Sequence, residues 1–213
     1  MSDEAEAVDE RHFEQVPVSN ARRLFRPKVP SLILTYSEET DSNVMTAMWW
    51  TSAAYRPAKM LLAVEHDCHT YDVLQNNDDF VMAMPTADMI DAVTVCGQTT
   101  GVEVDKFDEL DLETAPATEV DAPLLLDAGG NVECKTVHTH TYDGHTYFFA
   151  EPKAVHVRKG WFEDKVLTPA ADPLLYLGSH REDGETVRFY TGLDSEFRSS
   201  RDGDHLDGLP TAY

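Results

Sequence analysis

Two clusters of histidine and acidic residues have side chains that could bind a metal ion. One is the run EHDCH at 65–69, and the other consists of His138, His140 and His145. Zinc needs three or four ligands that converge in a tetrahedron, and the first cluster matches none of the common pairs such as C-x2-C or H-x3-H. In the second cluster, packing across a hairpin explains His138 and His140 equally well. We therefore expect no metal site at either cluster, since surface and half-buried histidines are common.

The signatures of several familiar catalytic sites are absent from the chain. There is no G-x-S-x-G nucleophile elbow of a serine hydrolase. There is also no P-loop and no G-x-G-x-x-G dinucleotide fingerprint. Nucleotide-triphosphate chemistry therefore has no visible site, and no residue is named as a catalytic acid, base or nucleophile.

Groups that favour a phosphate are scattered between residues 70 and 107. Thr70 is expected to begin a helix directly after a strand, where the first backbone N–H groups can bind an anion. The stretch CGQTTGVEVDKF at 96–107 adds hydroxyl groups, a glycine and Lys106, a cation in a very acidic chain. Lys106 could neutralise a bound phosphate, but a surface ion pair with Asp105 or Asp108 explains it at least as well. Residue types alone leave both interpretations open.

The stretch NVMTAMWW at 43–50 is flat and apolar, although an acidic loop comes directly before it. It ends in two adjacent tryptophans. Methionine and tryptophan at such positions usually fill a core. Core packing is therefore the default interpretation of Met45, Met48, Trp49 and Trp50.

Hydrophobic patterns place these groups on short elements. The expected strands lie at 30–37, 44–50, 59–66 and 80–85, with a polar loop at 38–43. The expected helices lie at 70–79, with Thr70 as N-cap, and at 86–98, with Thr86 as N-cap and Met89, Ile90 and Val93 on one face. Gly97 stands where the second helix should end.

A long hairpin is expected at 131–157, because Asp143-Gly144 is a strong two-residue turn signal. Such a turn places Tyr142 opposite His145, His140 opposite Tyr147 and His138 opposite Phe149. Aromatic residues then fall on both faces, so a helix or another subunit should cover each face. Many antiparallel strands with a few short helices predict a mainly β protein, a closed or partly closed barrel with helical decoration.

The charge balance excludes some partners. The chain has 39 acidic and 17 basic residues, a net charge of -22, spread along its whole length. This field repels nucleic acid and anionic membranes. An acidic folded surface is typical of halophilic proteins, because the Debye length falls to about 3 Å in 1 M salt and self-repulsion is screened.

Length and cysteine content predict one domain in a reducing compartment. The 213 residues suit a single domain at 16–192, with an acidic tail at 1–15 and a polar tail at 193–213. The three cysteines are odd in number and widely spaced, which favours free thiols. The acidic N-terminus lacks the charge and apolar run of a secretory signal, so we expect a cytoplasmic location.

Four stretches together resemble the flavin reductase-like family, the flavoredoxin-like FMN-binding split barrels. They are NVMTAMWWTSAA, TYDVLQNNDDFVMAMPT, CGQTTGVEVDKF and DPLLYLG. The resemblance spans about residues 20–180 and implies a Greek-key split barrel. It also implies a homodimer that binds FMN near the subunit interface.

The resemblance also implies which residues contact FMN. The strand at 43–47 and Trp49 would line the isoalloxazine ring. The start of the helix, at His69 and Thr70, and the 96–107 stretch would hold the phosphate. Tyr176 would approach the flavin region or the dimer contact. These residues are Asn43, Val44, Met45, Thr46, Ala47, Trp49, His69, Thr70, Thr100, Gly101, Lys106 and Tyr176. The apolar stretch would then form one wall for a flat ligand.

The implied activity is that of an NAD(P)H-dependent flavin oxidoreductase, with NADH or NADPH as electron donor. The hard chemistry would belong to the flavin, which explains the lack of a catalytic residue. Two alternatives remain open: a non-catalytic FMN-binding electron carrier or flavin store, and a pyridoxamine-phosphate-oxidase-like activity on the same barrel. A metal-binding or structural role is a more distant third.

Overall fold

The computed structural model describes residues 12–38, 41–168, 170–183 and 185–192. The expected C-terminal tail at 193–213 and most of the expected N-terminal tail lie outside these ranges. No helix in the described part of the chain has the length and apolar character needed to cross a bilayer.

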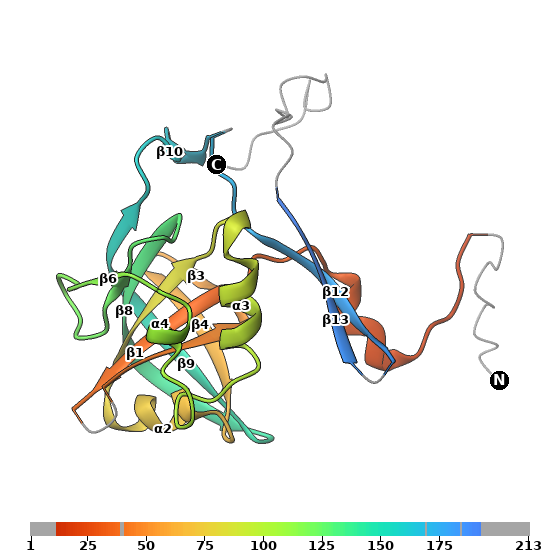
Figure 1. The fold of residues 1–213 in the computed structure, drawn as a ribbon, viewed down its shortest axis with the longest axis horizontal. Helices are drawn as coiled ribbons and strands as arrows, with labels where there is room; N and C mark the ends of the chain where they lie inside the picture. The colour runs from red at the N-terminus through yellow and green to blue at the C-terminus, as the bar shows by residue number, and fades with distance from the viewer. Residues whose placement is uncertain (1–11, 39–40, 169, 184, 193–213) are drawn as a thin grey trace, which may run out of the picture.

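The body of the molecule is an antiparallel sheet of seven strands, in the order β2-β1-β5-β8-β9-β4-β3 (Figure 1). Its strands are β1 Ser31–Ser37, β2 Asp41–Ala47, β3 Trp50–Tyr55, β4 Ala58–Glu65, β5 Asp79–Met84, β8 Gly130–Tyr142 and β9 His145–Val157. The sheet curls, and a hydrogen bond of 2.8 Å from Ala63 N to Trp49 O joins β4 to the link between β2 and β3. The protein is therefore mainly β, as the sequence predicts.

Short helices and two-stranded hairpins surround this sheet. The helices are η1 Val18–Asn20, α1 Ala21–Leu24, α2 His69–Asn76, η2 Ala87–Met89, α3 Ile90–Cys96 and α4 Lys106–Glu109. The remaining strands are β6 Thr114–Ala115, β7 Leu124–Leu125, β10 Phe162–Glu163, β11 Val166–Leu167, β12 Leu175–Glu182 and β13 Glu185–Thr191.

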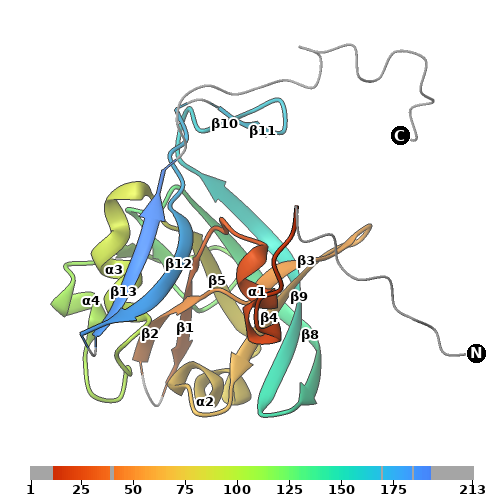
Figure 2. The ribbon, with the colours of Figure 1, turned by 90° about the vertical axis from the view of Figure 1, so that its right-hand side faces the viewer.

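The β12–β13 hairpin and α1 stand beside the barrel and pack near one another (Figures 1 and 2). Backbone hydrogen bonds between Lys28 and Tyr176, of 3.2 and 2.9 Å, tie the segment after α1 to β12. A bridge between Thr86 and Pro173 anchors the start of the hairpin to the barrel. This side unit therefore combines the two ends of the described chain.

The core lies on both sides of the sheet. Leu32 and Leu34 of β1 pack in one cluster with α3, whereas Ile33 packs in the other with Phe80 and Phe148. Alternate residues of β1 thus face opposite clusters, and all three are fully buried. A strand that is apolar on both faces needs this double cover.

The second predicted strand is partly wrong. β2 begins at Asp41, inside the expected loop, and ends at Ala47, while Trp50 opens the separate strand β3. The apolar run continues across the break at Met48 and Trp49, so its pattern gave no sign of a turn. β3 itself was missed, because its residues from Thr51 onward are exposed and mostly small or polar.

Two details of the predicted helices are also wrong. α2 begins at His69 with Cys68 as N-cap, so Thr70 lies within the first turn, where its buried hydroxyl accepts a tertiary hydrogen bond instead of capping the helix. The expected 86–98 helix opens with the 3-10 turn η2, which Thr86 precedes as N-cap. Met89 and Val93 are buried as expected, but Ile90 is exposed, because the tighter turn rotates it away from the apolar face.

The hairpin prediction is confirmed in its register. Tyr142 pairs with His145, His140 with Tyr147 and His138 with Phe149, across the turn at Asp143 and Gly144. Residues 137–142 of β8 are nevertheless exposed, so this chain alone does not cover both faces there.

Candidate functional site

A cavity with a volume of about 440 Å³ opens between β2, the start of α2 and the segment after α3. These three segments are far apart in sequence, and only the fold brings them together. A cavity of this size lies within the range of about 300–1,000 Å³ that is usual for small-molecule sites.

The end of β2 and the two residues after it form one wall. Met45, Thr46, Ala47, Met48 and Trp49 all line the cavity. A hydrogen bond of 2.7 Å from Thr46 Oγ1 to Val93 O holds this wall against α3. The Trp49 side chain is 45% exposed, and its ring stacks on His145 with centroids 5.0 Å apart.

Asn43 forms the polar end of the cavity together with His69 and Thr70, the first two residues of α2. Asn43 Nδ2 donates to Thr70 Oγ1 at 2.9 Å. Its other side-chain atom, Oδ1, is buried and has no hydrogen-bond partner among the described residues. A buried amide oxygen without a partner costs free energy unless a donor reaches it, so Asn43 can accept a hydrogen bond from a ligand.

Gly101 closes this end of the cavity by close backbone approach. A Cβ at this position would overlap Asn43 Oδ1 and would lie 3.0 Å from His69 Cδ2. Only glycine therefore lets the segment after α3 pack against Asn43. Thr100, the preceding residue, also lines the cavity.

Lys106 begins α4 and is 4% exposed. Its Nζ donates to Val44 O at 2.7 Å, and burial lowers the pKa of its ammonium group. The alternative of a surface ion pair is wrong, because Lys106 is buried and the Asp105 carboxylate caps α4 by accepting from Phe107 N and Asp108 N. An ammonium group has three N–H donors, so Lys106 can contact a ligand as well as Val44.

Ten of the twelve residues expected to contact FMN line this one cavity, namely Asn43, Met45, Thr46, Ala47, Trp49, His69, Thr70, Thr100, Gly101 and Lys106. Val44 does not: its side chain is fully buried in the core, and only its carbonyl reaches Lys106. Tyr176 lies on β12 and lines a separate, neighbouring cavity.

Several lining residues were missed. Met48, Gly97, Gln98 and Thr99 lie between predicted contacts and could have been named from their positions. Others are Ala63, Val64, Glu65, Asp67, Cys68 and Cys96. Glu65, Asp67 and Cys68 were considered only as possible metal ligands, and Cys96 only as the start of the 96–107 stretch. Ala63 and Val64 had no sequence signal, because they reach the cavity only through the packing of β4.

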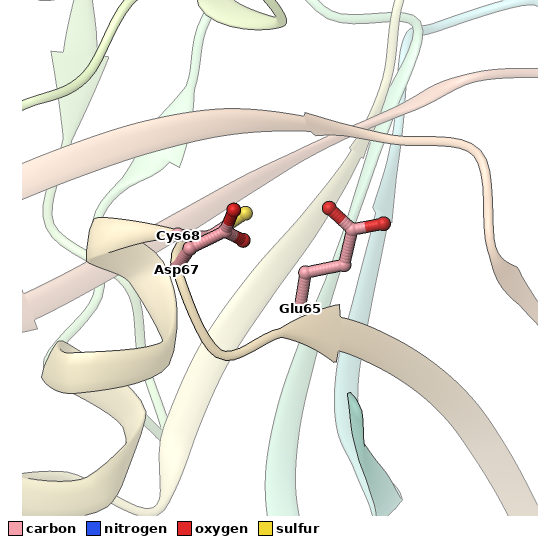
Figure 3. A group of neighbouring side chains, drawn as sticks. All are labelled: Glu65, Asp67 and Cys68. Carbon is pink, nitrogen blue, oxygen red and sulfur yellow. The ribbon is translucent and has the colours of Figure 1, made fainter. Parts of the chain in front are cut away.

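Three residues of the EHDCH run, all of which line the cavity, lie close together (Figure 3). Ligand atoms of Glu65, Asp67 and Cys68 lie within 4.8 Å of one another. Burial and the two neighbouring carboxylates raise the pKa of the Cys68 thiol, which disfavours the thiolate that binds metals. His66 is not part of the group, since it stacks on Tyr71 with centroids 4.5 Å apart. The group by itself therefore assigns no metal site.

The hairpin histidines serve different contacts. His138 packs on Phe149 with ring centroids 5.6 Å apart, as the cross-strand interpretation expected. His145 stacks on Trp49 and lies 3.3 Å from Glu65 Oε1. His145 thus supports the tryptophan in the cavity wall.

Comparison with known proteins gives a consistent result. The model of a domain family described as "Flavin reductase like domain" matches residues 26–185, well over half of the chain. An uncharacterized protein of Archaeoglobus fulgidus is 29% identical over 118 residues, which cover 55% of this chain and 66% of that protein.

Solved structures show the same fold. The flavoredoxin of Desulfovibrio vulgaris has a TM-score of 0.73 at 22% identity, over 88% of this chain and 97% of its own. An FMN-binding protein of Thermus thermophilus with bound 1-cyclohex-2-enone has a TM-score of 0.72 at 23% identity, over 88% and 97%. An NADH:FAD oxidoreductase of Streptomyces globisporus has a TM-score of 0.63 at 22% identity, over 83% and 98%. The predicted FMN-binding split-barrel fold is confirmed by these likenesses.

Proposed function

The chain belongs to the flavin reductase-like family, whose domain model matches residues 26–185, and on that premise we propose that it is an FMN-dependent oxidoreductase with NADH or NADPH as electron donor. The names of related structures support this proposal, since they include an FMN-binding protein and an NADH:FAD oxidoreductase.

One observation carries the proposal: the cavity of about 440 Å³ suits a flat, polar-edged ligand. Met45, Ala47 and Trp49 supply apolar surface for a ring. The orphan Asn43 Oδ1 supplies an acceptor, and Gly101 lets the segment after α3 pack against Asn43, so that Thr100 lines the cavity. The residues present therefore fit FMN.

Two groups of residues would hold FMN in this cavity. The end of β2, from Met45 to Ala47, would contact the ring. The phosphate would contact Thr70, Thr100, Gly101 and Lys106. Lys106 Nζ donates one hydrogen bond to Val44 O, and its remaining N–H groups would add a charge-assisted bond to the phosphate.

FMN, when bound, supplies the redox chemistry by accepting a hydride from reduced pyridine nucleotide. The protein would orient the ring through β2, which the bond from Thr46 to Val93 O holds against α3. This task needs no proton-transferring side chain, in keeping with the absence of a named catalytic residue.

An absorption spectrum in molar KCl, taken after addition of FMN and gel filtration, tests cofactor binding. A retained flavin band at about one FMN per chain is expected, as is oxidation of NADH or NADPH by the holoprotein with FMN in excess. A protein that retains no flavin and oxidises neither nucleotide would contradict the proposal.

A second candidate is an electron carrier that binds FMN but turns over slowly with pyridine nucleotides. The likeness to flavoredoxin favours it. Steady-state oxidation of NADH or NADPH separates the two, since rapid turnover excludes the carrier and a flavin band without turnover supports it.

We also propose that the protein is a homodimer. β3 from Thr51 onward and β8 from Val137 to Tyr142 are exposed, although Val137, Tyr142 and Tyr55 are large and apolar or aromatic. A second copy packed against either of these two regions would cover exposed apolar side chains. Light scattering coupled to gel filtration tests this, and a monomeric mass would contradict it.

We further propose a halophilic, cytoplasmic protein. The net charge of -22 and the carboxylates of Glu65 and Asp67 at the cavity both oppose folding and phosphate binding in dilute buffer. Melting temperature and FMN affinity should both rise between dilute buffer and molar KCl. Unchanged values would exclude the halophilic assignment.

A further inference from the structure

A second cavity, of about 240 Å³, adjoins the cavity of about 440 Å³ that is proposed to bind FMN, which we call the FMN cavity. The two cavities meet at the end of β2. Residues of α1 and of the β12–β13 hairpin line it, and these two elements stand on the same side of the barrel in Figure 2. Thr46, Met48, Trp49 and Gly97 line both cavities. A molecule in the second cavity would therefore lie beside the residues proposed to hold the flavin ring.

The charge of this second cavity is opposite to that of the chain. Arg22, Arg26 and Arg188 line it, and among the residues that the structure describes no aspartate or glutamate does. The whole chain has 39 acidic and only 17 basic residues, so three cations without a carboxylate depart strongly from its composition. Within the described side chains, no carboxylate forms an ion pair with any of the three arginines. We call this space the arginine cavity.

Two of these arginines are held by neutral neighbours. The guanidinium of Arg26 lies over the ring of Tyr176, with Cζ 4.3 Å from the ring centroid. With the Gln98 amide turned so that its oxygen faces β13, Arg188 donates to that oxygen, from Nη2 at 3.3 Å. Such contacts reduce the side-chain entropy that binding must remove, yet they leave the positive charge uncompensated. A guanidinium fork matches a carboxylate or phosphate in geometry.

The pKa of the Tyr176 hydroxyl is lowered by the same positive field. Burial alone would raise the pKa of its hydroxyl, but hydrogen bonds with Ser179 and Arg26 and the charges of Arg26 and Arg188 outweigh burial and lower the pKa. The environment thus favours a negative charge on the tyrosine. It favours a negative charge on a bound ligand for the same reason.

We propose that the arginine cavity binds the anionic group, a carboxylate or a phosphate, of the small molecule that exchanges electrons with the flavin. This inference rests on the proposed function. The phosphate of FMN itself is assigned to the other end of the main cavity, since Thr70, Thr100 and Lys106 do not line the arginine cavity. Two sources remain: the diphosphate of a pyridine nucleotide and the carboxylate of an organic acid substrate.

The test compares the wild type with Arg22→Gln/Arg188→Gln, and uses Arg23→Gln as matched control. Arg23 lies on the same helix and donates to Ser179 O at 2.9 Å, but it does not line the cavity. Pyrophosphate and benzoate serve as probes, because they carry the two candidate groups. Tryptophan fluorescence follows their binding, since Trp49 is in the wall of the cavity. The exposed single variant Arg22→Gln replaces the double variant if the latter does not fold.

The wild type should bind one of the probes, and the double variant should bind it at least about tenfold more weakly, as loss of charge-assisted contacts predicts. Weaker pyrophosphate binding points to the nucleotide, and weaker benzoate binding points to an acid substrate. No binding to the wild type, or equal loss in Arg23→Gln, overturns the proposal. So does a double variant that loses affinity for FMN but not for riboflavin, because the cavity would then hold the flavin phosphate. Failure to retain FMN contradicts only the proposed function, since tryptophan reads the anion site without flavin.

Discussion

Two clusters of buried polar groups serve opposite purposes in this protein. In the first, the fully buried Glu133 accepts hydrogen bonds from Thr118 N and Oγ1, from Glu119 N at 2.6 Å and from His156 Nε2 at 2.6 Å. Burial alone would raise the pKa of Glu133, but these bonds outweigh it and lower the pKa to about 2. The carboxylate is charged, buried and fully satisfied.

The second cluster, Asn43 and Lys106, is equally buried but incomplete. Asn43 Oδ1 has no partner among the described residues. Lys106 Nζ donates to Val44 O, and its pKa is lowered by burial. The two clusters therefore do not differ in burial but in how many of their hydrogen bonds are made. The full set at Glu133 holds loop 118–119 to the barrel, whereas the partial set at Asn43 and Lys106 marks a place for a ligand.

Glu133→Gln tests the first half of this contrast and should have the largest effect. An amide cannot accept all of these hydrogen bonds, so the free energy of unfolding should fall by about 3–5 kcal/mol. Urea unfolding in molar KCl measures it, and FMN affinity of the folded protein should stay unchanged. Glu151→Gln on β9 is the control, since Glu151 pairs with Lys59 and Lys153 at the surface and should change little. A loss of FMN affinity without a loss of stability would break the comparison.

Acid should remove the stability that Glu133 provides. Its pKa is about 2 in the folded protein and near 4.5 without these contacts. A lowered folded pKa means that the stabilisation is complete above about pH 4.5 and is lost as the pH falls toward 2. Urea midpoints measured across this range should drop more steeply for the wild type than for Glu133→Gln. Parallel curves would show that Glu133 is not the responsible group.

Lys106→Met tests the second cluster. Loss of a charge-assisted contact should weaken FMN binding by about 1.5–3 kcal/mol, with little effect on riboflavin, which has no phosphate. Fluorescence titration with both flavins measures this, with Lys135→Met on the exposed side of β8 as control. Equal losses for the two flavins would show that Lys106 only supports Val44.

Gly101→Ala should have a smaller but specific effect. The new Cβ would overlap Asn43 Oδ1, so Asn43 must move and its bond to Thr70 should weaken. We expect about tenfold lower FMN affinity, or about 1.4 kcal/mol, with a minor change in melting temperature. Val102→Ala is a matched neighbour whose side chain is exposed. Unchanged affinity in Gly101→Ala would remove Asn43 from the binding site.

The smallest expected effect is that of bound FMN on the rate of thiol alkylation. Burial raises the pKa of Cys96 to about 11 and of Cys134 to about 12, and both thiols are buried. Cys68 is only half-buried and lines the FMN cavity, so it should react first with iodoacetamide, and FMN should slow it. Peptide mass mapping with and without FMN gives the rates. Preferential labelling of Cys134 would contradict the buried arrangement.

Much of the local structure could be predicted from residue patterns, and most of the residues that line the candidate site could be predicted from the family resemblance. The Asp143-Gly144 turn specified the register of β8 and β9 as far as the pair His138–Phe149, and beyond it two irregularities shift the register. Ten predicted cofactor residues were found along one cavity, because they lie within stretches whose order and spacing carry the family resemblance. Odd, widely spaced cysteines predicted free thiols, and the three described cysteines are free.

Which buried polar groups have a full set of hydrogen-bond partners could be seen only in the tertiary structure. Thr70 gave up its expected cap position for a bond with Asn43, and Lys106 was buried although a surface pair was equally plausible. Neither Glu133 nor the arginine cavity has a local signal. Each depends on segments separated by many residues, and a hydrogen bond or a shared charge field depends on distances that sequence spacing does not contain. Local periodicity could therefore predict the strands, whereas the chemistry of the two clusters followed only from how the strands and loops pack.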